Sequence, residues 1–244
     1  MRILHLLLTL ILAFGISAPA QKTADQDTDN TKTDKQESGK APERAEAAAR
    51  VLREIAAAPD KGIPNEVLGK SKCVIVIPGV KNVGFVFGGR YGRGYATCRT
   101  PHSWSAPAPV FMGGGSYGAQ IGAEGVDLVL LVVDDKGVQK LLSSKFEIGV
   151  DASAAAGPVG RSATAGTDWK LNSELLSYSR AKGLFAGIDV SGATVRQDDS
   201  TTKELYGRMI PFKDILSGKV PTPPAAMAFV REVQKDFIEA RAEK

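Results

Sequence analysis

A glycine-rich stretch at residues 113–118, Gly-Gly-Gly-Ser-Tyr-Gly, holds the two patterns with the clearest catalytic meaning in this chain. Starting at Gly113, it matches GxGxxG, the turn that brings a dinucleotide pyrophosphate close to a helix N-terminus. That chemistry needs a strand before the glycines and a helix after them. Residues 119–125 (AQIGAEG) are too glycine-rich for a stable helix, so the context does not favour a dinucleotide cofactor.

The same stretch contains GxSxG around Ser116, the pattern of a nucleophile elbow. A hydrolase of this kind needs a histidine later in the chain to accept the serine proton. His102 is the only histidine outside the first twenty residues, and it precedes Ser116 in a turn-like Pro-His-Ser context. We therefore expect a non-enzymatic protein. A hydrolase remains the alternative that would require His102 within hydrogen-bond reach of Ser116.

Metal and cofactor motifs give no support for a bound group. One histidine and two cysteines make no plausible zinc or iron site, and the aspartates lack EF-hand spacing. No phosphate-binding Walker glycine loop is present. We expect no metal, no cofactor and no catalytic residues.

Cys73 and Cys98 are the only cysteines. Their even number and their places in neighbouring predicted strands favour a disulfide in an exported protein. The alternative is a pair of inert thiols in the core.

The N-terminus has the features of a cleavable export signal. Arg2 precedes an apolar run at residues 3–16, and Ala18-Pro19-Ala20 places small residues at a cleavage site before Gln21. Residues 21–42 have no aromatic or large aliphatic residue and predict a disordered linker. Residues 43–244 then form one domain. We expect a periplasmic or secreted protein, either free or peripheral to a membrane.

The pattern of apolar residues predicts an α+β fold: an antiparallel β-rich core with amphipathic helices at its N- and C-terminal ends. Helices are predicted at 43–58, 64–69, 138–142, 198–206, 211–216 and 225–242. Strands are predicted at 73–77, 83–87, 91–99, 110–112, 117–121, 126–133, 175–178, 184–190 and 193–196, with extended chain at 146–152. Pro78-Gly79 is predicted to end the first strand, and residues 88–90 to form a hairpin turn.

Basic residues concentrate between residues 61 and 100, where seven lysines and arginines accompany one acidic residue, Glu66. Such an excess is a candidate footprint for an anionic partner, although an ordinary solvated face gives the same pattern. Nucleic acid is not expected, because an exported protein rarely meets it.

An ordered series of motifs resembles the SYLF domain family. The series spans about residues 60 to 207, and its specificity comes from the order, since each motif is weak alone. The motifs are 77–80 (IPGV), 84–94 (GFVFGGRYGRG), 104–108 (WSAPA), 113–122 (GGGSYGAQIG), 127–129 (DLV), 145–149 (KFEIG), 154–161 (AAAGPVGR), 178–180 (YSR) and 183–187 (GLFAG).

This resemblance implies lipid binding through an N-terminal amphipathic helix and basic residues, and, for fungal members, binding to actin filaments. The chain departs from such relatives in its export signal, its cysteine pair and the lack of an SH3 or FYVE module. Actin is therefore an unlikely partner on the sequence alone.

The leading hypothesis is a non-enzymatic domain that docks on anionic phospholipid head groups in the cell envelope or outside the cell. The alternative is a structural or protein-interaction module with an envelope protein partner and no direct lipid binding. In that case the N-terminal helix packs on the core. The membrane-facing apolar candidates are Val51, Leu52 and Ile55, and the lipid-binding candidates are Arg50, Arg53, Lys61, Lys70, Lys72, Lys81, Arg90 and Arg93.

Overall fold

A computed structural model describes residues 40–56, 62–84, 87–117, 125–160, 173–181 and 184–242. The predicted signal peptide and residues 21–39 of the predicted linker lie outside this range, as does Lys61. Export and the linker therefore stay predictions.

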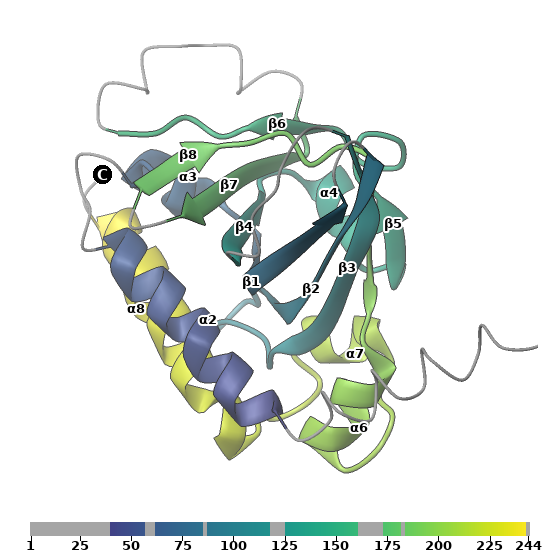
Figure 1. Ribbon diagram of the computed structural model, residues 1–244. Helices are drawn as coiled ribbons and strands as arrows, with labels where there is room; N and C mark the ends of the chain where they lie inside the picture. The colour runs from purple at the N-terminus through teal and green to yellow at the C-terminus, as the bar shows by residue number, and fades with distance from the viewer. Residues whose placement is uncertain are drawn as a thin grey trace, which may run out of the picture.

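The described strands form a single nine-stranded sheet (Figure 1). Its order is β5-β9-β3-β2-β1-β4-β7-β6, and β8 also pairs with β7. Every pairing is antiparallel except the one between β6 and β7. The strands are β1 Cys73–Gly84, β2 Phe87–Cys98, β3 Ala108–Tyr117, β4 Val126–Val132, β5 Lys145–Glu147, β6 Ala154–Ala156, β7 Leu175–Ala181, β8 Leu184–Gly187 and β9 Ala193–Gln197.

Helices lie at both ends of the chain, so the predicted α+β class is confirmed. They are α2 Ala41–Ala56, α3 Asn65–Lys70, α4 Asp135–Leu141, α6 Asp199–Tyr206, α7 Phe212–Leu216 and α8 Met227–Ala242, with a 3-10 turn at Pro224–Ala226 before the last helix. None of the helices in the described ranges is both long and apolar enough to cross a membrane.

The strands bury apolar side chains on both faces of the sheet, because the β1 sequence is apolar at successive positions. One face, which includes Val74, Val76 and Tyr95, packs against α2, α3 and α8. The other face, which includes Ile75 and Ile77, lines the inside of the curled sheet. Figure 1 shows α2 and α8 side by side on one flank and α6 and α7 below β3. The sheet thus has a helix-covered side and an enclosed core.

The disulfide is present as predicted. Cys73 and Cys98 are directly paired on β1 and β2, and both are buried in the enclosed core. It joins the start of the first strand to the end of the second.

The prediction that Pro78-Gly79 ends the first strand is wrong. β1 continues to Gly84, and its register with both neighbours shifts around these two residues. Gly79 has φ +60°, and its N–H donates to Asp127 Oδ1 at 2.9 Å. Pro78 has no N–H to donate to a neighbouring strand. A β-bulge at this position places Pro78 outside the regular hydrogen-bond pattern, so the strand continues beyond it.

Several other predicted boundaries also need correction. Residues 88–90 do not form a hairpin turn but lie within β2, paired with both β1 and β3. The third strand runs from Ala108 through Tyr117, and residues 118–121 lie outside the described range. β8 ends at Gly187 rather than at residue 190, and β5 ends at Glu147, before a turn. The local patterns placed these strands, but the ladder of backbone hydrogen bonds set their ends.

Candidate functional site

The predicted nucleophile and its predicted base lie at opposite ends of the same pair of strands. Ser116 pairs with Gly88 near the start of β2, whereas His102 lies in the bend that follows the end of β2 at Cys98. Ten residues of extended strand separate these ends, a distance of about 30 Å. This geometry does not support a hydrolase built on Ser116 and His102.

The apolar face of the N-terminal helix lies in the core. Val51, Leu52 and Ile55 are each at most 4% exposed, and they belong to the cluster that contains Phe229 and Val233 of α8. In this conformation their side chains meet protein and not a membrane. Their burial favours the alternative reading, in which α2 is a structural part of the domain.

The predicted basic residues do not converge into one site. Lys72 precedes β1 and Lys81 lies past its bulge, nine residues away, which corresponds to about 30 Å of strand. Arg50 and Lys81 are exposed. Four of the other predicted cations form ion pairs with carboxylates of the domain: Arg53 with Glu46 and Glu232, Lys70 with Glu66, Lys72 with Asp135, and Arg93 with Asp198.

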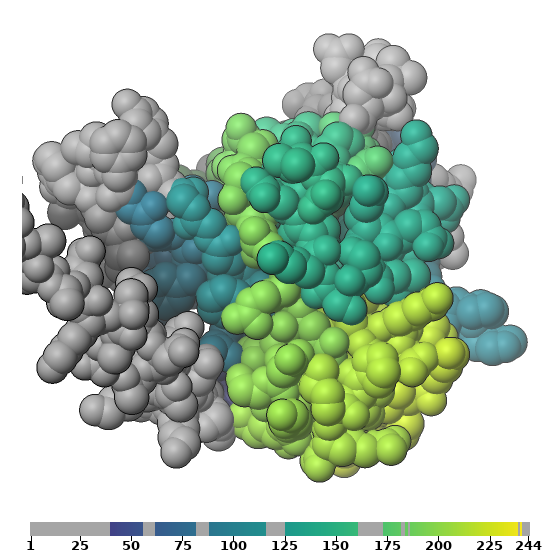
Figure 2. Space-filling model, turned by 90° about the vertical axis from the view of Figure 1, so that its right-hand side faces the viewer, coloured from purple at the N-terminus to yellow at the C-terminus, as the bar shows by residue number. Residues whose placement is uncertain are grey.

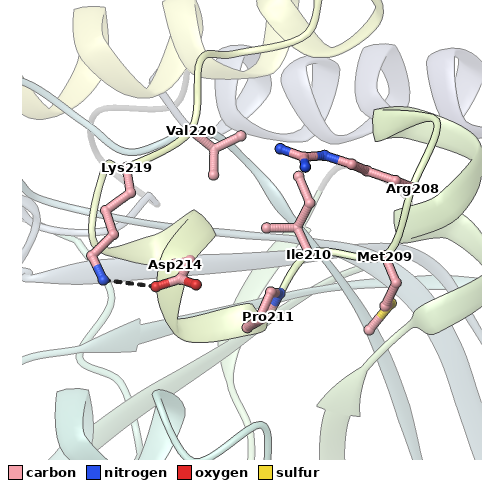
Figure 3. Close-up of a pocket in the computed structure, with 7 residues that line it drawn as sticks. All are labelled: Arg208, Met209, Ile210, Pro211, Asp214, Lys219 and Val220. Atoms are coloured by element: carbon pink, nitrogen blue, oxygen red, sulfur yellow. Dashed lines mark hydrogen bonds and ion pairs between the residues drawn. The ribbon is translucent and has the colours of Figure 1, made fainter.

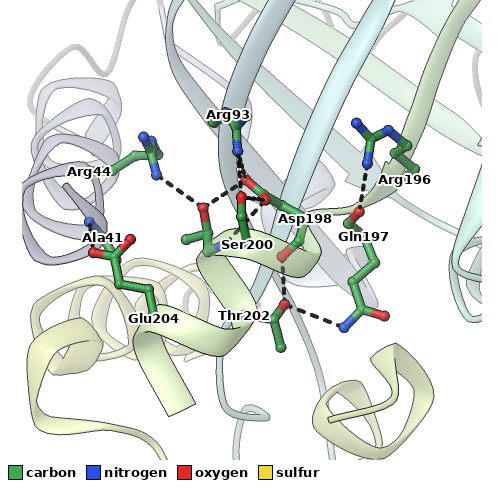
Figure 4. A network of polar contacts seen from close by, with 10 residues as sticks. Ala41, Arg44, Arg93, Arg196, Gln197, Asp198, Ser200, Thr202 and Glu204 are labelled. Atoms are coloured by element: carbon green, nitrogen blue, oxygen red, sulfur yellow. Dashed lines mark hydrogen bonds and ion pairs between the residues drawn. The ribbon is translucent and has the colours of Figure 1, made fainter. Parts of the chain in front are cut away.

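Arg93 is the most buried of the cations in these ion pairs. Its side chain is 10% exposed, and its Nη1 atom donates to Asp198 Oδ2 at 2.6 Å and to Ser200 Oγ at 3.1 Å. Asp198 also caps α6, because its carboxylate accepts from Thr201 N–H at 3.1 Å and from the Thr201 hydroxyl at 2.7 Å. Arg93 therefore fixes α6 against β2 (Figure 4).

The environment of Asp198 favours its ionised form. Burial works to raise the pKa of its carboxyl group, but hydrogen bonds from Thr201 and Ser200 and the charge of Arg93 outweigh burial. The pKa of Asp198 is consequently below its usual value. The carboxylate stays charged at neutral pH and can hold Arg93 in place.

The same network holds the first residue of α2. Ala41 N–H donates to Glu204 Oε1 on α6 at 2.9 Å, and Ala41 C=O accepts from the Tyr95 hydroxyl at 2.7 Å. Arg44 reaches Thr201 Oγ1 at 3.5 Å. A carboxylate at a helix N-terminus is stabilising because it complements the helix dipole. Figure 4 shows α2 and α6 meeting at these contacts.

Strands β2, β3, β9 and β5 bring cations and aromatic rings together on the surface of the sheet. The register aligns Arg93 opposite Phe111, Phe111 opposite Arg196, and Arg196 opposite Lys145. A second row, two residues further along the strands, contains Lys81, Tyr91, Gly113, Thr194 and Glu147. We call these two rows the cationic face.

The cationic face is open to solvent. Lys81, Lys145 and Arg196 are exposed, and Phe111 and Tyr91 are partly exposed. Neighbouring side chains on the same strands, such as Met112 and Val195, point the other way into the enclosed core. This alternation is the usual consequence of the strand period of two.

Phe111 lies between two guanidinium groups. Its ring centroid is 4.5 Å from Arg196 Cζ and 5.5 Å from Arg93 Cζ. The ring also extends over Gly113, where an added Cβ would come within 2.8 Å of it. Lys81 Nζ lies 5.8 Å from the Tyr91 ring centroid. Such contacts attract a cation to the ring face and keep long side chains in defined positions.

Sequence reasoning missed Lys145, Arg196 and Phe111 as members of one surface. Phe111 and Arg196 alternate with buried residues on their strands, and this period of two was the available signal. Their proximity depends on pairing between β3 and β9, which are about 85 residues apart in the chain, so local patterns could not supply it.

A hollow of about 260 Å³ lies beside α7 (Figure 3). Ile210, Pro211 and Val220 give it an apolar floor, and Figure 3 shows Arg208 extended toward them. Its second cation, Lys219, is already paired with Asp214 at 2.8 Å. The hollow has room for a small side chain or ligand, and it contains no arrangement of nucleophile and base.

Arg90 contributes to a separate cavity of about 230 Å³ at the other end of the strands. The cavity has apolar walls from Val80, Val126 and Leu128 and lies next to Asp189. Arg90 directly precedes Tyr91 on β2 but faces the opposite side of the strand, at the edge of the enclosed core. Figure 2 shows the molecule from the side on which α6 and α7 lie below the teal segment that holds α4 and β5.

Comparison with known proteins gives a consistent family. A family model, Ysc84, described as "Las17-binding protein actin regulator", matches residues 113–236. Protein YSC84 of Saccharomyces cerevisiae is 34% identical over 204 residues, which cover 80% of this chain and 42% of the yeast protein. SH3 domain-containing protein PJ696.02 of Schizosaccharomyces pombe is 38% identical over 168 residues, covering 67% of this chain and 39% of that protein.

An animal relative matches over a similar range. SH3 domain-containing YSC84-like protein 1 of Homo sapiens is 31% identical over 189 residues, which cover 75% of this chain and 55% of the human protein. The chain thus spans about two fifths to one half of the length of the relatives it matches. The extent of these matches shows that the chain belongs to the Ysc84 family, the SYLF-domain proteins.

Proposed function

We propose that this chain is a non-enzymatic protein-interaction module and that its partner is the actin filament. The observation that carries the proposal is membership of a family whose model is described as an actin regulator. Relatives are likewise named for binding, as in LAS seventeen-binding protein 3 of Saccharomyces cerevisiae. The cationic face is open to contact with another protein, whereas the apolar face of α2 is buried in the core and is not available to a membrane.

This proposal corrects the partner predicted from the sequence. Anionic phospholipid was the expected partner and actin was considered unlikely, yet the matched family is described by a protein partner and by actin regulation. The physical basis of the lipid prediction is also weakened. Val51, Leu52 and Ile55 are buried, and several of the basic residues are already paired within the domain.

The absence of catalysis is part of the proposal. Ser116 and His102 lie at opposite ends of β2 and β3, and the relatives are named as binding or regulatory proteins. Binding by charge and aromatic contact requires none of the proton transfers that a hydrolase needs.

Co-sedimentation with purified actin filaments tests the proposal. The chain, with its disulfide formed, is centrifuged with increasing concentrations of filaments, and the bound fraction is measured in the pellet. We expect the fraction in the pellet to rise and saturate as filaments increase. A chain that stays in the supernatant at every filament concentration, and at low as well as physiological salt, contradicts the proposal.

A further inference from the structure

We propose that the cationic face is a docking surface for an acidic, extended segment of a protein partner. The inference rests on the proposed function, because it takes the partner to be a protein. It adds which surface of the domain the partner contacts and which kind of side chain the partner presents. The proposed occupant is a short run of Asp or Glu residues that lies across strands β5, β9, β3 and β2.

The first argument is an uncompensated pair of like charges. Lys145 and Arg196 are directly opposite each other on β5 and β9, and both are exposed. Like charges in this position destabilise a sheet. No carboxylate of the described residues forms an ion pair with either cation; Arg196 instead makes a 3.4 Å contact with the carbonyl of Gln197. An acidic partner would relieve this repulsion.

The second argument is that the cations are held in position before any partner arrives. Arg196 stacks on Phe111 at 4.5 Å, and Phe111 is confined from the other side by Arg93, which Asp198 fixes at 2.6 Å. A positioned guanidinium loses less conformational freedom on binding than a mobile lysine. Aromatic and arginine side chains are also the residues that carry most binding energy in protein interfaces.

The third argument is the shape of the face. The first row crosses three strand spacings, about 14 Å, which matches four to five residues of an extended segment. The Phe111 ring covers Gly113, but the strand is bare at Gly115 on the same side, where an added Cβ would meet no atom within 4 Å. A peptide backbone can therefore approach the sheet closely beside the aromatic rings.

The net positive charge of the cationic face favours a negatively charged partner segment. Its two rows contain Lys145, Arg196, Lys81 and Arg93 against one carboxylate, Glu147, at the β5 edge. Arg93 is neutralised by Asp198, so the free charge of the face remains positive. Charge complementarity favours an acidic segment and makes its association sensitive to salt.

Titration with a fluorescent hexaglutamate peptide tests the face directly, and actin co-sedimentation tests it in the proposed function. The main variant is Lys145→Glu with Arg196→Glu. The matched control is Lys213→Glu with Arg231→Glu, since both of these side chains are exposed and lie outside the two rows. The two double variants have the same net charge, so any general electrostatic effect is equal in both.

We expect the peptide to bind the unchanged chain with an affinity that falls as salt rises. The main variant should bind at least tenfold more weakly, whereas the control should remain within about twofold of the unchanged chain. Equal affinity in the two double variants, or no peptide binding to the unchanged chain, overturns the inference.

A single variant separates docking from folding. Lys145→Glu creates an opposite-charge pair with Arg196, so its melting temperature should equal or exceed that of the unchanged chain. Its peptide affinity should nevertheless fall severalfold. Unchanged affinity in this folded variant counts against the face.

The outcomes also separate this inference from the proposed function. If filaments bind the unchanged chain and both double variants equally, the face is wrong and the actin proposal stands. If the peptide distinguishes the variants but filaments do not bind the unchanged chain, actin is wrong and the acidic-segment surface stands.

Discussion

Arg93 and Arg196 show how two arginines on the same face of a sheet can have different roles. Both point to the side of the cationic face, and both contact the Phe111 ring. Arg93 has Asp198 as a buried partner, whereas Arg196 is exposed. The sequence could identify Arg93 as basic but could not pair it with a carboxylate 105 residues away. That distant contact gives Arg93 a structural role, whereas Arg196 remains exposed for contact with a partner.

Asp198 makes the stability of the domain depend on pH. Its folded-state pKa lies below the ordinary value for an aspartate, so the stabilisation is present above about pH 4 and is lost as pH falls through the folded pKa. Asp198→Asn should reduce the free energy of unfolding by about 3 kcal/mol at pH 7, since it breaks a buried ion pair. The difference from the unchanged chain should shrink toward pH 3.

Urea denaturation at pH 7, 5, 4 and 3 measures this effect. Asp199→Asn is the matched control, because Asp199 is the exposed neighbour of Asp198. Its unfolding free energy should stay within about 0.5 kcal/mol of the unchanged chain at each pH. A difference for Asp198→Asn that remains constant down to pH 3 would show that ionisation of this carboxyl group is not the cause.

Among the elements, the helices were easier to predict than the strand ends. The N-terminal helix was predicted at residues 43–58 and is found at Ala41–Ala56, because its apolar spacing is a local property. What covers that apolar face is not local, and the sequence left both core and membrane open. Packing of α2 on α8, about 180 residues later, decides this question.

The sequence favours a structural role for the strand glycines, in curved strands or close backbone packing, but it does not say which glycine has which role. Gly94 faces the enclosed core beside the register shift of β1, where an added Cβ would lie 1.9 Å from the carbonyl oxygen of Val76. Gly115 lies on the outer side with open space around its Cβ position. Only the tertiary arrangement separates the glycine that the fold requires from the one that it tolerates.

This contrast gives a matched pair of substitutions. Gly94→Ala should lower the free energy of unfolding by about 3 kcal/mol, because backbone atoms must move to admit the methyl group. Gly115→Ala should change it by no more than about 0.5 kcal/mol. Chemical denaturation of both variants measures the difference, and equal stability would mean that the close approach of β1 to Gly94 does not constrain the fold.

For the whole molecule, the α+β class, the family resemblance and the disulfide followed from the sequence, and all three are confirmed. The partner did not follow. Charge counted along the chain suggested one basic segment, but folding sends Lys72 and Lys81 to opposite ends of β1 and places Arg93 in a buried ion pair. The residues that share the cationic face come from strands paired across the sheet, and the order of those strands cannot be read from any one segment of the sequence.

The disulfide links the stability of the whole molecule to its compartment. Replacing both Cys73 and Cys98 by alanine should lower the unfolding free energy by about 3 kcal/mol, since the cross-link restricts the unfolded chain. A reductant should destabilise the unchanged chain by a similar amount and leave the double variant unaffected. Destabilisation of both by the reductant would point to a cause other than this bond.

Export is a separate prediction from the N-terminal sequence, and if it holds, the chain meets actin filaments only outside the cytoplasm of the cell that makes it. Mass spectrometry of the mature protein should find Gln21 as its first residue, with the disulfide formed. A chain that retains Met1 and is recovered with reduced cysteines contradicts export.

The contacts at Ala41 have a mechanical consequence. A pull on the N-terminal end of α2 enters the folded domain at this residue, where Glu204 holds its N–H and Tyr95 holds its carbonyl group. From Glu204 the load passes along α6 to Asp198, and from there through Arg93 to the strand that borders Phe111. Tension at the N-terminus would thus be borne by α6 and the sheet before α2 peels from α8. If an acidic segment occupies the cationic face, a pull on Ala41 would reach that face through Glu204, α6, Asp198 and Arg93.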